Sequence, residues 1–457
     1  MRLAVIGAGY VGLVSSACFA SLGHEVILVE TDPDRFADLK SRRLHLYEPN
    51  LEELVALQTT SGMLRFSNCL DQAVQGVDAV FLAVGTPSHW GDGHVDTDAL
   101  VQAVERLALC LRHSIVLVTK STVPVGTSRK ISQQMRKLRP DLAIEVAANP
   151  EFLRNGRAIN DFMRPDRIVL GCEGPRAHAF MQAVYQPLES HCANIIYTEL
   201  ETAEMIKYAA NSFLGMKIAF INEMSDICES LGADIEAVGD ALGLDRRIGS
   251  AYLNPGPGFG GASLPGDLQA LATSAKHAGV PSRLIEATIS ANQSRQNTLA
   301  SRVSAACGGS LRGKKIAVLG LTYKPDTDDI SNSPALPLLE GLVDLGAQVH
   351  AYDPMGMDNA YAQFHGSVKF CASLQCAVQQ ADAVITVTDW SEFRRLNPRK
   401  LLEAMRGNVF VDLRNIFDPC TMRMAGFNYH SLGRSQAEQA PFIMASAYHF
   451  DKRIVLC

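Results

Sequence analysis

Short apolar runs separated by amphipathic stretches fill the first 200 residues of the chain. The runs are rich in Val, Ile and Leu, and they read LAVIG, EVILVE, AVFLAV, SIVLVT and IEVAAN. Runs of this kind are typical of strands buried on both faces, and the segments between them have the period of a helix. The pattern predicts βαβ units that build a mostly parallel sheet with helices on both faces.

A different pattern begins near Thr198. From Glu201 to Leu231 there is no proline and no strand signal, and apolar residues recur along one stripe. The stripe predicts one long helix, which must bury its apolar face against other helices or a second subunit. Helical patterning resumes from about Gly266 to Ala305.

Buried strands return from Lys314 onward, in KKIAVLGLTYKP, QVHAYDP, AVITVT and NVFVDLR. We therefore expect an α/β protein with two Rossmann-like doubly wound domains, joined by a central helical region that contains the long helix. The expected divisions are residues 1–200, 201–305 and 306–457. The last 20 or so residues have weak periodicity and support no prediction.

Composition and charge narrow the function classes. The 457 residues carry a formal net charge of -6, which gives no electrostatic footprint for nucleic acid or an anionic membrane. No apolar run approaches the roughly 20 residues of a membrane span, and the chain opens directly on a strand, so we expect a cytoplasmic protein. The 11 cysteines form no CxxC pairs, and we expect neither a disulfide framework nor a metal site.

A dinucleotide fingerprint follows the first predicted strand. Gly7-Ala8-Gly9-Tyr10-Val11-Gly12 has the GxGxxG spacing, in which the glycines allow a tight turn, close approach of a pyrophosphate, and close packing of helix on strand. Glu30, at the end of the second strand, can accept hydrogen bonds from a ribose and would repel a 2′-phosphate, which favours NAD over NADP. Arg35 lies close enough in sequence to bind such a phosphate. The alternative is a glycine turn without a nucleotide.

Three polar clusters follow successive predicted strands: Gly85-Thr86-Pro87, the segment 120–124 and the segment 149–153. Each alone could be ordinary turn chemistry, but ligands bind at this edge of an open α/β sheet, so three together indicate a site.

Two further features carry chemistry. Lys207 and Asn211 are four residues apart on the long helix and share a face, where apolar neighbours would partly desolvate the lysine. The alternative is a lysine that reaches into solvent. The glycine-rich segment 256–261 suits close approach to a ligand, and the alternative is a flexible linker.

These segments resemble the UDP-glucose/GDP-mannose dehydrogenase family, above all its bacterial UDP-glucose 6-dehydrogenases. The resemblance rests on an ordered series of motifs from residue 1 to about residue 335: GAGYVG, YEPNLEEL, GTP, KSTVPVGT, NPEFLRNG, RPDRIVLG, ETAEMIKYAANSFLGMKIAFINE, RRIG, GFGGASLPGD and GLTYKPDTDDISNSPA.

The resemblance implies an NAD-binding domain, a central dimerisation region and a UDP-binding domain, in a homodimer or a multiple of one. It implies oxidation of the C6 alcohol of a nucleotide sugar to a carboxylate with two NAD, which for UDP-glucose gives UDP-glucuronate, a precursor in polysaccharide biosynthesis.

The family's functional residues carry over by position. The catalytic and water-handling positions are Thr122, Glu151, Lys207, Asn211, Ser263 and Asp267. The cofactor positions are Gly7, Gly9, Tyr10, Val11, Gly12, Glu30, Arg35, Thr86, Thr122 and Glu151. The substrate positions are Glu151, Phe152, Leu153, Lys207, Asn211, Arg247, Tyr252, Gly256, Gly258, Gly260 and Lys324, where Arg247 is expected to come from the neighbouring subunit.

Three positions depart from the family pattern. Ser263 stands where the family has a nucleophilic cysteine, Gly266 where it has a lysine, and Ser331 where it has an arginine that contacts NAD. A serine hydroxyl is a weak nucleophile unless a base activates it, whereas a thiol is partly ionised near neutral pH. Two hypotheses follow: an active UDP-sugar dehydrogenase, or an impaired or inactive paralogue that binds NAD and UDP-sugar as a regulatory or structural subunit.

Overall fold

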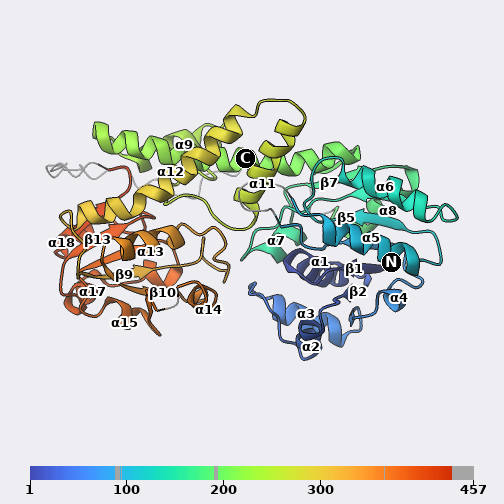
Figure 1. Cartoon of the computed structure of the whole chain (residues 1–457), viewed down its shortest axis with the longest axis horizontal. Coiled ribbons are helices and arrows are strands. Elements are labelled where there is room, and N and C mark those ends of the chain that lie inside the picture. Colours follow the sequence, from blue (N-terminus) through green and yellow to red (C-terminus); the bar gives the residue numbers. More distant parts are fainter. Residues whose placement is uncertain (88–92, 94, 190–193, 365, 435–457) are drawn as a thin grey trace.

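Two α/β domains joined by helices make up the chain (Figure 1). The computed structural model describes residues 1–87, 93, 95–189, 194–364 and 366–434. The expected fold class is confirmed. None of the described helices combines the length and apolarity that a membrane crossing needs.

The N-terminal domain is an eight-stranded sheet of order β3-β2-β1-β4-β5-β6-β7-β8, parallel except for the pair β6 and β7. Its strands are β1 (Arg2–Ile6), β2 (Glu25–Val29), β3 (Leu64–Ser67), β4 (Ala79–Leu82), β5 (Val116–Thr119), β6 (Glu145–Ala148), β7 (Ile168–Cys172) and β8 (Ile195–Thr198). Alternate residues of β1 enter two cores: Leu3 and Val5 enter one, and Ala4 and Ile6 the other.

Helices cover both faces of this sheet. The first core receives α1 (Tyr10–Ser21), α3 (Leu51–Thr60), α7 (Ala158–Met163) and α8 (Pro175–Tyr185). The second receives α4 (Leu70–Ala73), α5 (Asp98–Cys110), α6 (Thr127–Leu138) and the start of α9. The short α2 (Pro33–Lys40) follows β2, and a 3-10 turn, Gln186–Leu188, follows α8.

The predicted long helix is present as α9 (Leu200–Leu231), and Gly232, with φ of 78°, ends it. It reaches from the N-terminal domain across to the C-terminal side of the molecule (Figure 1). The predicted helical stretch 266–305 consists of two helices, α11 (Ser263–His277) and α12 (Arg283–Ala306). Gly279 and Pro281 separate them, since Gly279 has φ of 72° and a proline cannot continue a helix.

The C-terminal domain is a six-stranded parallel sheet of order β11-β10-β9-β12-β13-β14. Its strands are β9 (Lys315–Leu319), β10 (Gln348–Tyr352), β11 (Lys369–Phe370), β12 (Ala383–Thr386), β13 (Val409–Asp412) and β14 (Asn428–Ser431). Its helices are α13 (Ala335–Asp344), α14 (Met357–Tyr361), α15 (Leu374–Val378), α16 (Ser391–Arg394), α17 (Pro398–Ala404) and α18 (Pro419–Met424). Leu299 and Val303 of α12 belong to one of its two cores, so α12 is anchored to this domain.

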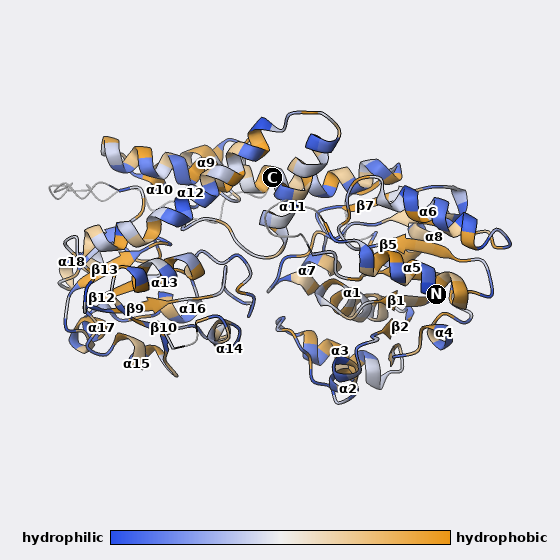
Figure 2. Cartoon of the chain, viewed as in Figure 1, coloured by the Kyte–Doolittle hydropathy of each residue, from blue (hydrophilic) through white to orange (hydrophobic). Residues whose placement is uncertain are grey.

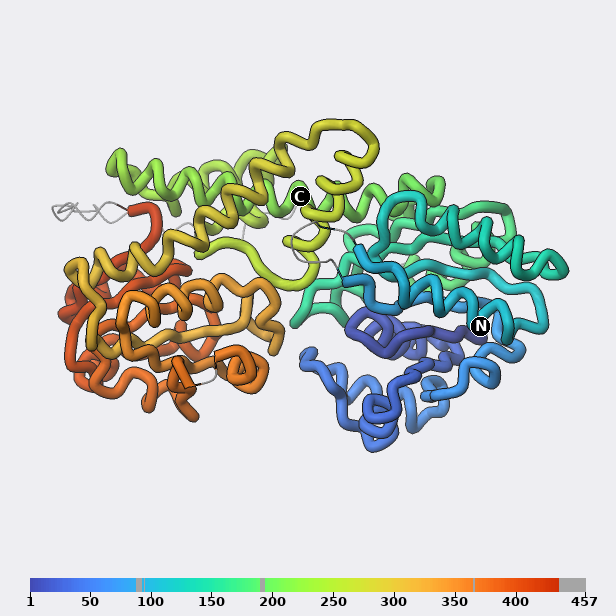
Figure 3. The backbone as a smooth tube through the Cα atoms, viewed as in Figure 1, coloured from blue at the N-terminus to red at the C-terminus, as the bar shows by residue number. Residues whose placement is uncertain are grey.

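Two features of the connecting region position the site. After α10 (Ile235–Leu244), the backbone runs between the two domains before it enters α11 (Figure 3). Figure 2 shows apolar residues gathered in the sheets, but α9 also carries apolar side chains that the single chain leaves exposed, among them Phe213, Phe220 and Ile227.

Candidate active site

A cavity of about 1010 Å³ is lined by residues of both domains and of the connecting region. It receives the end of β6, one face of α9, the segment 251–264 and the segment after β9. Of the predicted site residues, the structure brings eleven to its wall: Glu151, Phe152, Leu153, Lys207, Asn211, Tyr252, Gly256, Gly258, Gly260, Ser263 and Lys324.

Lys207 and Glu151 form a buried ion pair in this wall. Lys207 Nζ lies 2.8 Å from Glu151 Oε1, and the two residues are only 3% and 7% exposed. Glu151 Oε2 accepts a second bond from the backbone N–H of Leu153 at 2.6 Å. The lysine therefore does not reach into solvent, and its ammonium is held at a fixed point in the cavity.

Asn211 and Asp267 form a second buried pair. Asn211, one helical turn after Lys207 on α9, donates from Nδ2 to Asp267 Oδ2 at 2.5 Å. Burial raises the pKa of Asp267 to about 6; the charge of Lys207 and the bond from Asn211 oppose this change, and the charge of Glu151 adds to it. This carboxyl group can therefore gain or lose a proton close to neutral pH.

Ser263 is the first residue of α11 and is exposed at the cavity wall. Asp267 is four residues later on the same helix, so both residues lie on one side of it. Gly266 places no side chain beside them. The cavity-lining residues among those that the structure describes include no histidine that could activate the serine hydroxyl.

The fingerprint glycines have the geometry that a dinucleotide needs. Gly7 has φ of 102°, and a Cβ there would lie 2.7 Å from the carbonyl oxygen of Ala83. A Cβ on Gly12 would lie 1.8 Å from the carbonyl oxygen of Gly7, whereas a Cβ on Gly9 would meet nothing within 4 Å. The turn is thus closed on its protein side and open where a pyrophosphate would approach the start of α1.

Other predicted cofactor positions surround this turn. Glu30 follows β2 and is buried, and its Oε1 accepts the N–H of Asp32 at 2.9 Å. Thr86 Oγ1 donates to the carbonyl oxygen of Thr122 at 2.6 Å, which joins the ends of β4 and β5. Arg35 lies in the first turn of α2, where its N–H is capped by Asp32. These residues fit an adenosine dinucleotide along the edge of the sheet.

Tyr10 has a structural contact that the motif alone does not reveal. Its hydroxyl donates to Glu48 Oε2 at 2.5 Å, and Glu48 also accepts the N–H groups of Gly156 at 2.6 Å and Ala158 at 2.7 Å. The first turn of α1 is thereby tied to the loop that follows Glu151.

The C-terminal domain contributes Tyr323, Lys324 and Arg414 to the cavity wall. Lys324 Nζ donates to the carbonyl oxygen of Asn155, which connects the two domains. Arg414 also lines the cavity: its Nε donates to the carbonyl oxygen of Val387 at 2.7 Å and its Nη2 to that of Tyr323 at 3.0 Å. Sequence reasoning missed Arg414, although it stands at the end of the strand NVFVDLR, where the strand-end rule applied to the first sheet would have found it.

Lys120 belongs to one of the predicted strand-end clusters, but its own placement was not foreseen. It is buried at the cavity wall and donates to Asn149 Oδ1 at 3.1 Å. Burial lowers the pKa of Lys120 to about 8, against the charge of Glu151.

Some predicted residues lie elsewhere. Arg247 is exposed outside this cavity and pairs with Asp245 at 2.6 Å, so the single chain does not bring it to the site. Thr122 lines a separate small void that Lys207 also borders. The carbonyl oxygen of Ser331 accepts the N–H of Gly261 at 2.7 Å, which puts this residue beside the glycine-rich segment.

Family models match the chain in three consecutive parts, which correspond to the first α/β domain, the connecting region and the second α/β domain. Residues 1–189 match the NAD binding domain of the UDP-glucose/GDP-mannose dehydrogenase family, residues 201–294 its central domain, and residues 317–419 its UDP binding domain. The UDP-glucose 6-dehydrogenase of Rhizobium meliloti (strain 1021) is 46% identical over 442 residues, which cover 95% of this chain and 100% of that protein.

Two solved structures match nearly the whole chain. A UDP-glucose dehydrogenase from Pyrobaculum islandicum superimposes with a TM-score of 0.87 at 35% identity, over 95% of this chain and 98% of that one. A UDP-D-ManNAc dehydrogenase from Pyrococcus horikoshii has a TM-score of 0.83 at 26% identity, over 95% and 99%. The chain therefore belongs to the UDP-glucose/GDP-mannose dehydrogenase family.

Proposed function

We propose that the chain is an NAD-dependent 6-dehydrogenase that converts UDP-glucose to UDP-glucuronate. The observation that carries the proposal is the set of groups at one cavity: Lys207, Glu151 and Asn211 line it, Asn211 binds the buried Asp267, and Lys324 and Arg414 reach the same cavity from the C-terminal domain. UDP-glucose is the first choice of sugar because it is the substrate named for the Rhizobium meliloti relative.

In this scheme the chain supplies the protein groups that the first oxidation needs. NAD held at the turn from Gly7 to Gly12 would supply the acceptor for the hydride that leaves C6 of the sugar. The Lys207 ammonium, fixed by Glu151, donates hydrogen bonds to the C6 oxygen and stabilises the negative charge that develops on it. Asp267, ionised above a pKa of about 6 and oriented by Asn211, takes the hydroxyl proton, directly or through a water molecule. Thr122, at the border of the small void beside Lys207, helps to hold that water.

The second oxidation is where Ser263 matters. We place it at the family's nucleophile position, with Gly266 at the position of the family's lysine. Before the second hydride can leave, the aldehyde must add either water, to give a hydrate, or Ser263 Oγ, to give a hemiacetal. Oxidation of the hydrate, for which a second NAD would supply the hydride acceptor, gives the carboxylic acid directly; oxidation of the hemiacetal gives a serine ester, which water then hydrolyses to the carboxylate and free Ser263. Asp267 lies on the same side of α11 and can accept the proton in both cases. Without a thiol, this half-reaction is expected to be slower than the first.

Counting NADH per UDP-glucose with the purified protein tests the proposal. A result between one and two in a short assay, approaching two at long times, is expected. UDP-N-acetylhexosamines serve as competing substrates, since the Pyrococcus horikoshii relative is named for UDP-D-ManNAc. No NADH with any UDP-sugar, while NAD and UDP still bind, would favour the binding-only subunit; the buried ion pair of Lys207 with Glu151 and the Asp267 carboxyl oriented by Asn211 argue against that outcome.

The matched replacement examines the role of Ser263 directly. Ser263→Cys together with Gly266→Lys should raise carboxylate formation more than either single change, because the lysine charge acts on the thiolate and on the developing oxyanion. An unchanged rate in the double variant, with ligands still bound, would contradict the placement of Ser263.

The remaining proposals concern the whole chain. We infer a homodimer or a multiple of one, in the cytoplasm, with domains at residues 1–200, 201–305 and 306–457. The exposed apolar residues of α9 support self-association, and the exposed Arg247 is available to the cavity of a neighbour.

A further inference from the structure

The glycine loop, residues 256–261, lines the cavity and is held from behind by two helices. At its start, the N–H of Gly256 donates to Asn222 Oδ1 of α9 at 2.8 Å, and the carbonyl oxygen of Gly256 accepts from Arg295 Nε of α12 at 3.1 Å. Both backbone groups of this residue are therefore bound by buried side chains.

A second attachment lies three residues later. Phe259 donates its N–H to Asn292 Oδ1 at 2.8 Å, and its carbonyl oxygen accepts from Asn292 Nδ2 at 3.0 Å and from Gln296 Nε2 at 3.1 Å. Asn292, Arg295 and Gln296 share one face of α12 because they are three and four residues apart. Since α12 is anchored in the C-terminal domain, this face fixes the loop to that domain.

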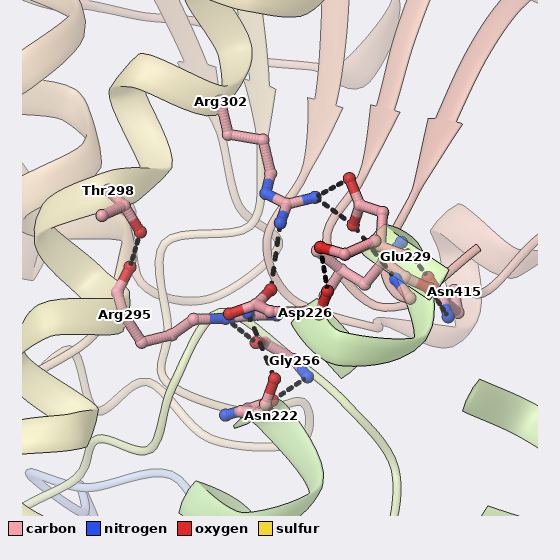
Figure 4. A network of polar contacts seen from close by, with 11 residues as sticks. Asn222, Asp226, Glu229, Gly256, Arg295, Thr298, Arg302 and Asn415 are labelled. Atoms are coloured by element: carbon pink, nitrogen blue, oxygen red, sulfur yellow. Dashed lines mark hydrogen bonds and ion pairs between the residues drawn. The ribbon is translucent and has the colours of Figure 1, made fainter. Parts of the chain in front are cut away.

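Arg295 is itself held by an ion network (Figure 4). Its Nη1 lies 2.5 Å from Asp226 Oδ1 of α9, and its side chain is only 6% exposed. Asp226 also pairs with Arg302 at 3.1 Å, and Arg302 pairs with Glu229 at 2.7 Å. Arg302 does not contact the loop. It shares the carboxylate of Asp226 with Arg295, but its other contact is with Glu229 and not with Gly256.

The loop position matters to the cavity because other groups pack against it. A Cβ on Gly256 would lie 3.1 Å from Arg414 Nη1, and a Cβ on Gly260 would lie 2.4 Å from the carbonyl oxygen of Asn332. The loop therefore fits between α12 behind it and the C-terminal domain beside it, and a shift of Gly256 changes the wall next to the Arg414 guanidinium.

We propose that Arg295 is a positioning residue for the UDP-sugar: its guanidinium, fixed by Asp226, sets the place of the glycine loop over the nucleotide-sugar region of the cavity. Arg295 does not line the cavity, so it acts through the Gly256 backbone. The inference rests on the proposed function of this cavity. It concerns the sugar nucleotide alone, because the dinucleotide turn at Gly7 to Gly12 shares none of these contacts.

Two matched variants test it. Arg295→Met keeps the aliphatic volume and removes the donor to Gly256; we expect the KM for UDP-glucose and the Kd for UDP to rise about tenfold to a hundredfold, while the KM for NAD changes less than about twofold. Arg302→Met removes pairs with the same Asp226 and with Glu229 but leaves the loop contact; we expect a change of less than about twofold in the Kd for UDP. Arg295→Lys, which keeps the charge and one donor, should give an intermediate Kd.

Asp226→Asn covers the case in which Arg295→Met does not fold. Asp226 is half exposed, and its neutral form no longer fixes the guanidinium, so UDP affinity should fall while NAD affinity holds. Equal effects of Arg295→Met and Arg302→Met on UDP affinity, or a lower kcat with unchanged UDP affinity, would overturn the inference. A wild-type protein that neither binds UDP nor forms NADH would instead overturn the proposed function.

Discussion

At the scale of single residues, the pKa of Asp267 predicts how activity depends on pH. Burial disfavours the carboxylate, so its pKa stands at about 6, above the usual range of an aspartate. A proton acceptor must be ionised, and kcat should therefore fall as pH drops through about 6. Asp267→Asn should lower kcat by about a hundredfold or more and remove that acid limb. A pH–rate profile between about pH 5 and 8 checks both, because the window spans this pKa; an unchanged acid limb in the variant would assign it to another group.

The buried pair of Lys207 and Glu151 allows catalytic and structural roles to be separated. Lys207→Met leaves an unpaired carboxylate in the interior and should reduce the free energy of unfolding by about 3 to 5 kcal/mol, with loss of activity. Adding Glu151→Gln removes the stranded charge, so the double variant should recover most of the stability and none of the activity. Urea unfolding and NADH formation measure the two effects. Recovery of activity in the double variant would show that the pair is not catalytic.

At the scale of elements, the sequence predicted most of the strands that are buried on both faces. Central strands such as β1, β4, β5 and β9 are buried on both faces and therefore appear as continuous apolar runs. The edge strands β3, β8, β11 and β14 were not predicted, because they are short and partly exposed, with polar residues among the apolar ones. The internal strand β7 was also not predicted, although it is buried.

The site was only partly predictable, for a related reason. Local spacing places Lys207 and Asn211 on one face of a helix and puts Glu151 at the end of a strand. Lys207 meets Glu151 because α9 packs at the end of β6, and Asn211 meets Asp267 because α9 packs against α11; local spacing contains neither piece of information. The network of Asn222, Asp226 and Arg295 is hidden from sequence for the same reason, since its members lie on helices about 70 residues apart.

Gly258 allows the glycine loop to be tested as an element. Its φ is 117°, and a Cβ there would lie 2.9 Å from Asn292 Oδ1, so Gly258→Ala combines backbone strain with a clash. We expect a loss of UDP affinity of about tenfold or more, with NAD affinity unchanged. Gly279→Ala is the matched control, because its φ of 72° is also positive but its Cβ would meet nothing within 4 Å. Calorimetry with UDP decides; equal losses in the two variants would exclude a special role for the loop.

At the scale of the whole molecule, the two α/β domains match the NAD binding and UDP binding domains of the family, and the proposed reaction takes place in the cavity that residues of both domains line. The connecting helices hold both domains, since α9 begins in the core of the first and α12 ends in the core of the second. A movement of one domain relative to the other would therefore strain α9, α11 and α12 together, and the cavity wall from Lys207 to Gly260 is built on these elements.

The exposed side of α9 predicts that the chain self-associates. Phe213, Phe220 and Ile227 repeat every seven residues and are 58%, 47% and 42% exposed. Phe213 also lines the cavity, so the cavity wall adjoins this apolar stripe, and Arg247 of a second copy could approach it there. Light scattering at micromolar concentration should give a dimer or a multiple of one. Phe220→Glu should shift the oligomeric equilibrium toward the monomer. Leu109→Glu is the control, because Leu109 lies on α5 and is 83% exposed, and this change should leave the oligomeric state as it is.

A mixing experiment can then show whether the two copies share a site. Arg247→Ala lacks the arginine that a neighbour would use, and Lys207→Met lacks the lysine of its own cavity, so each variant alone should be nearly inactive. In a mixed dimer, the cavity of the Arg247→Ala chain keeps its own Lys207 and receives Arg247 from the other chain, which leaves one complete site. Co-expression should therefore restore activity well above the sum of the two variants. If Arg247 instead served its own cavity, one chain would lack Arg247 and the other Lys207, and no mixture of them could contain a complete site.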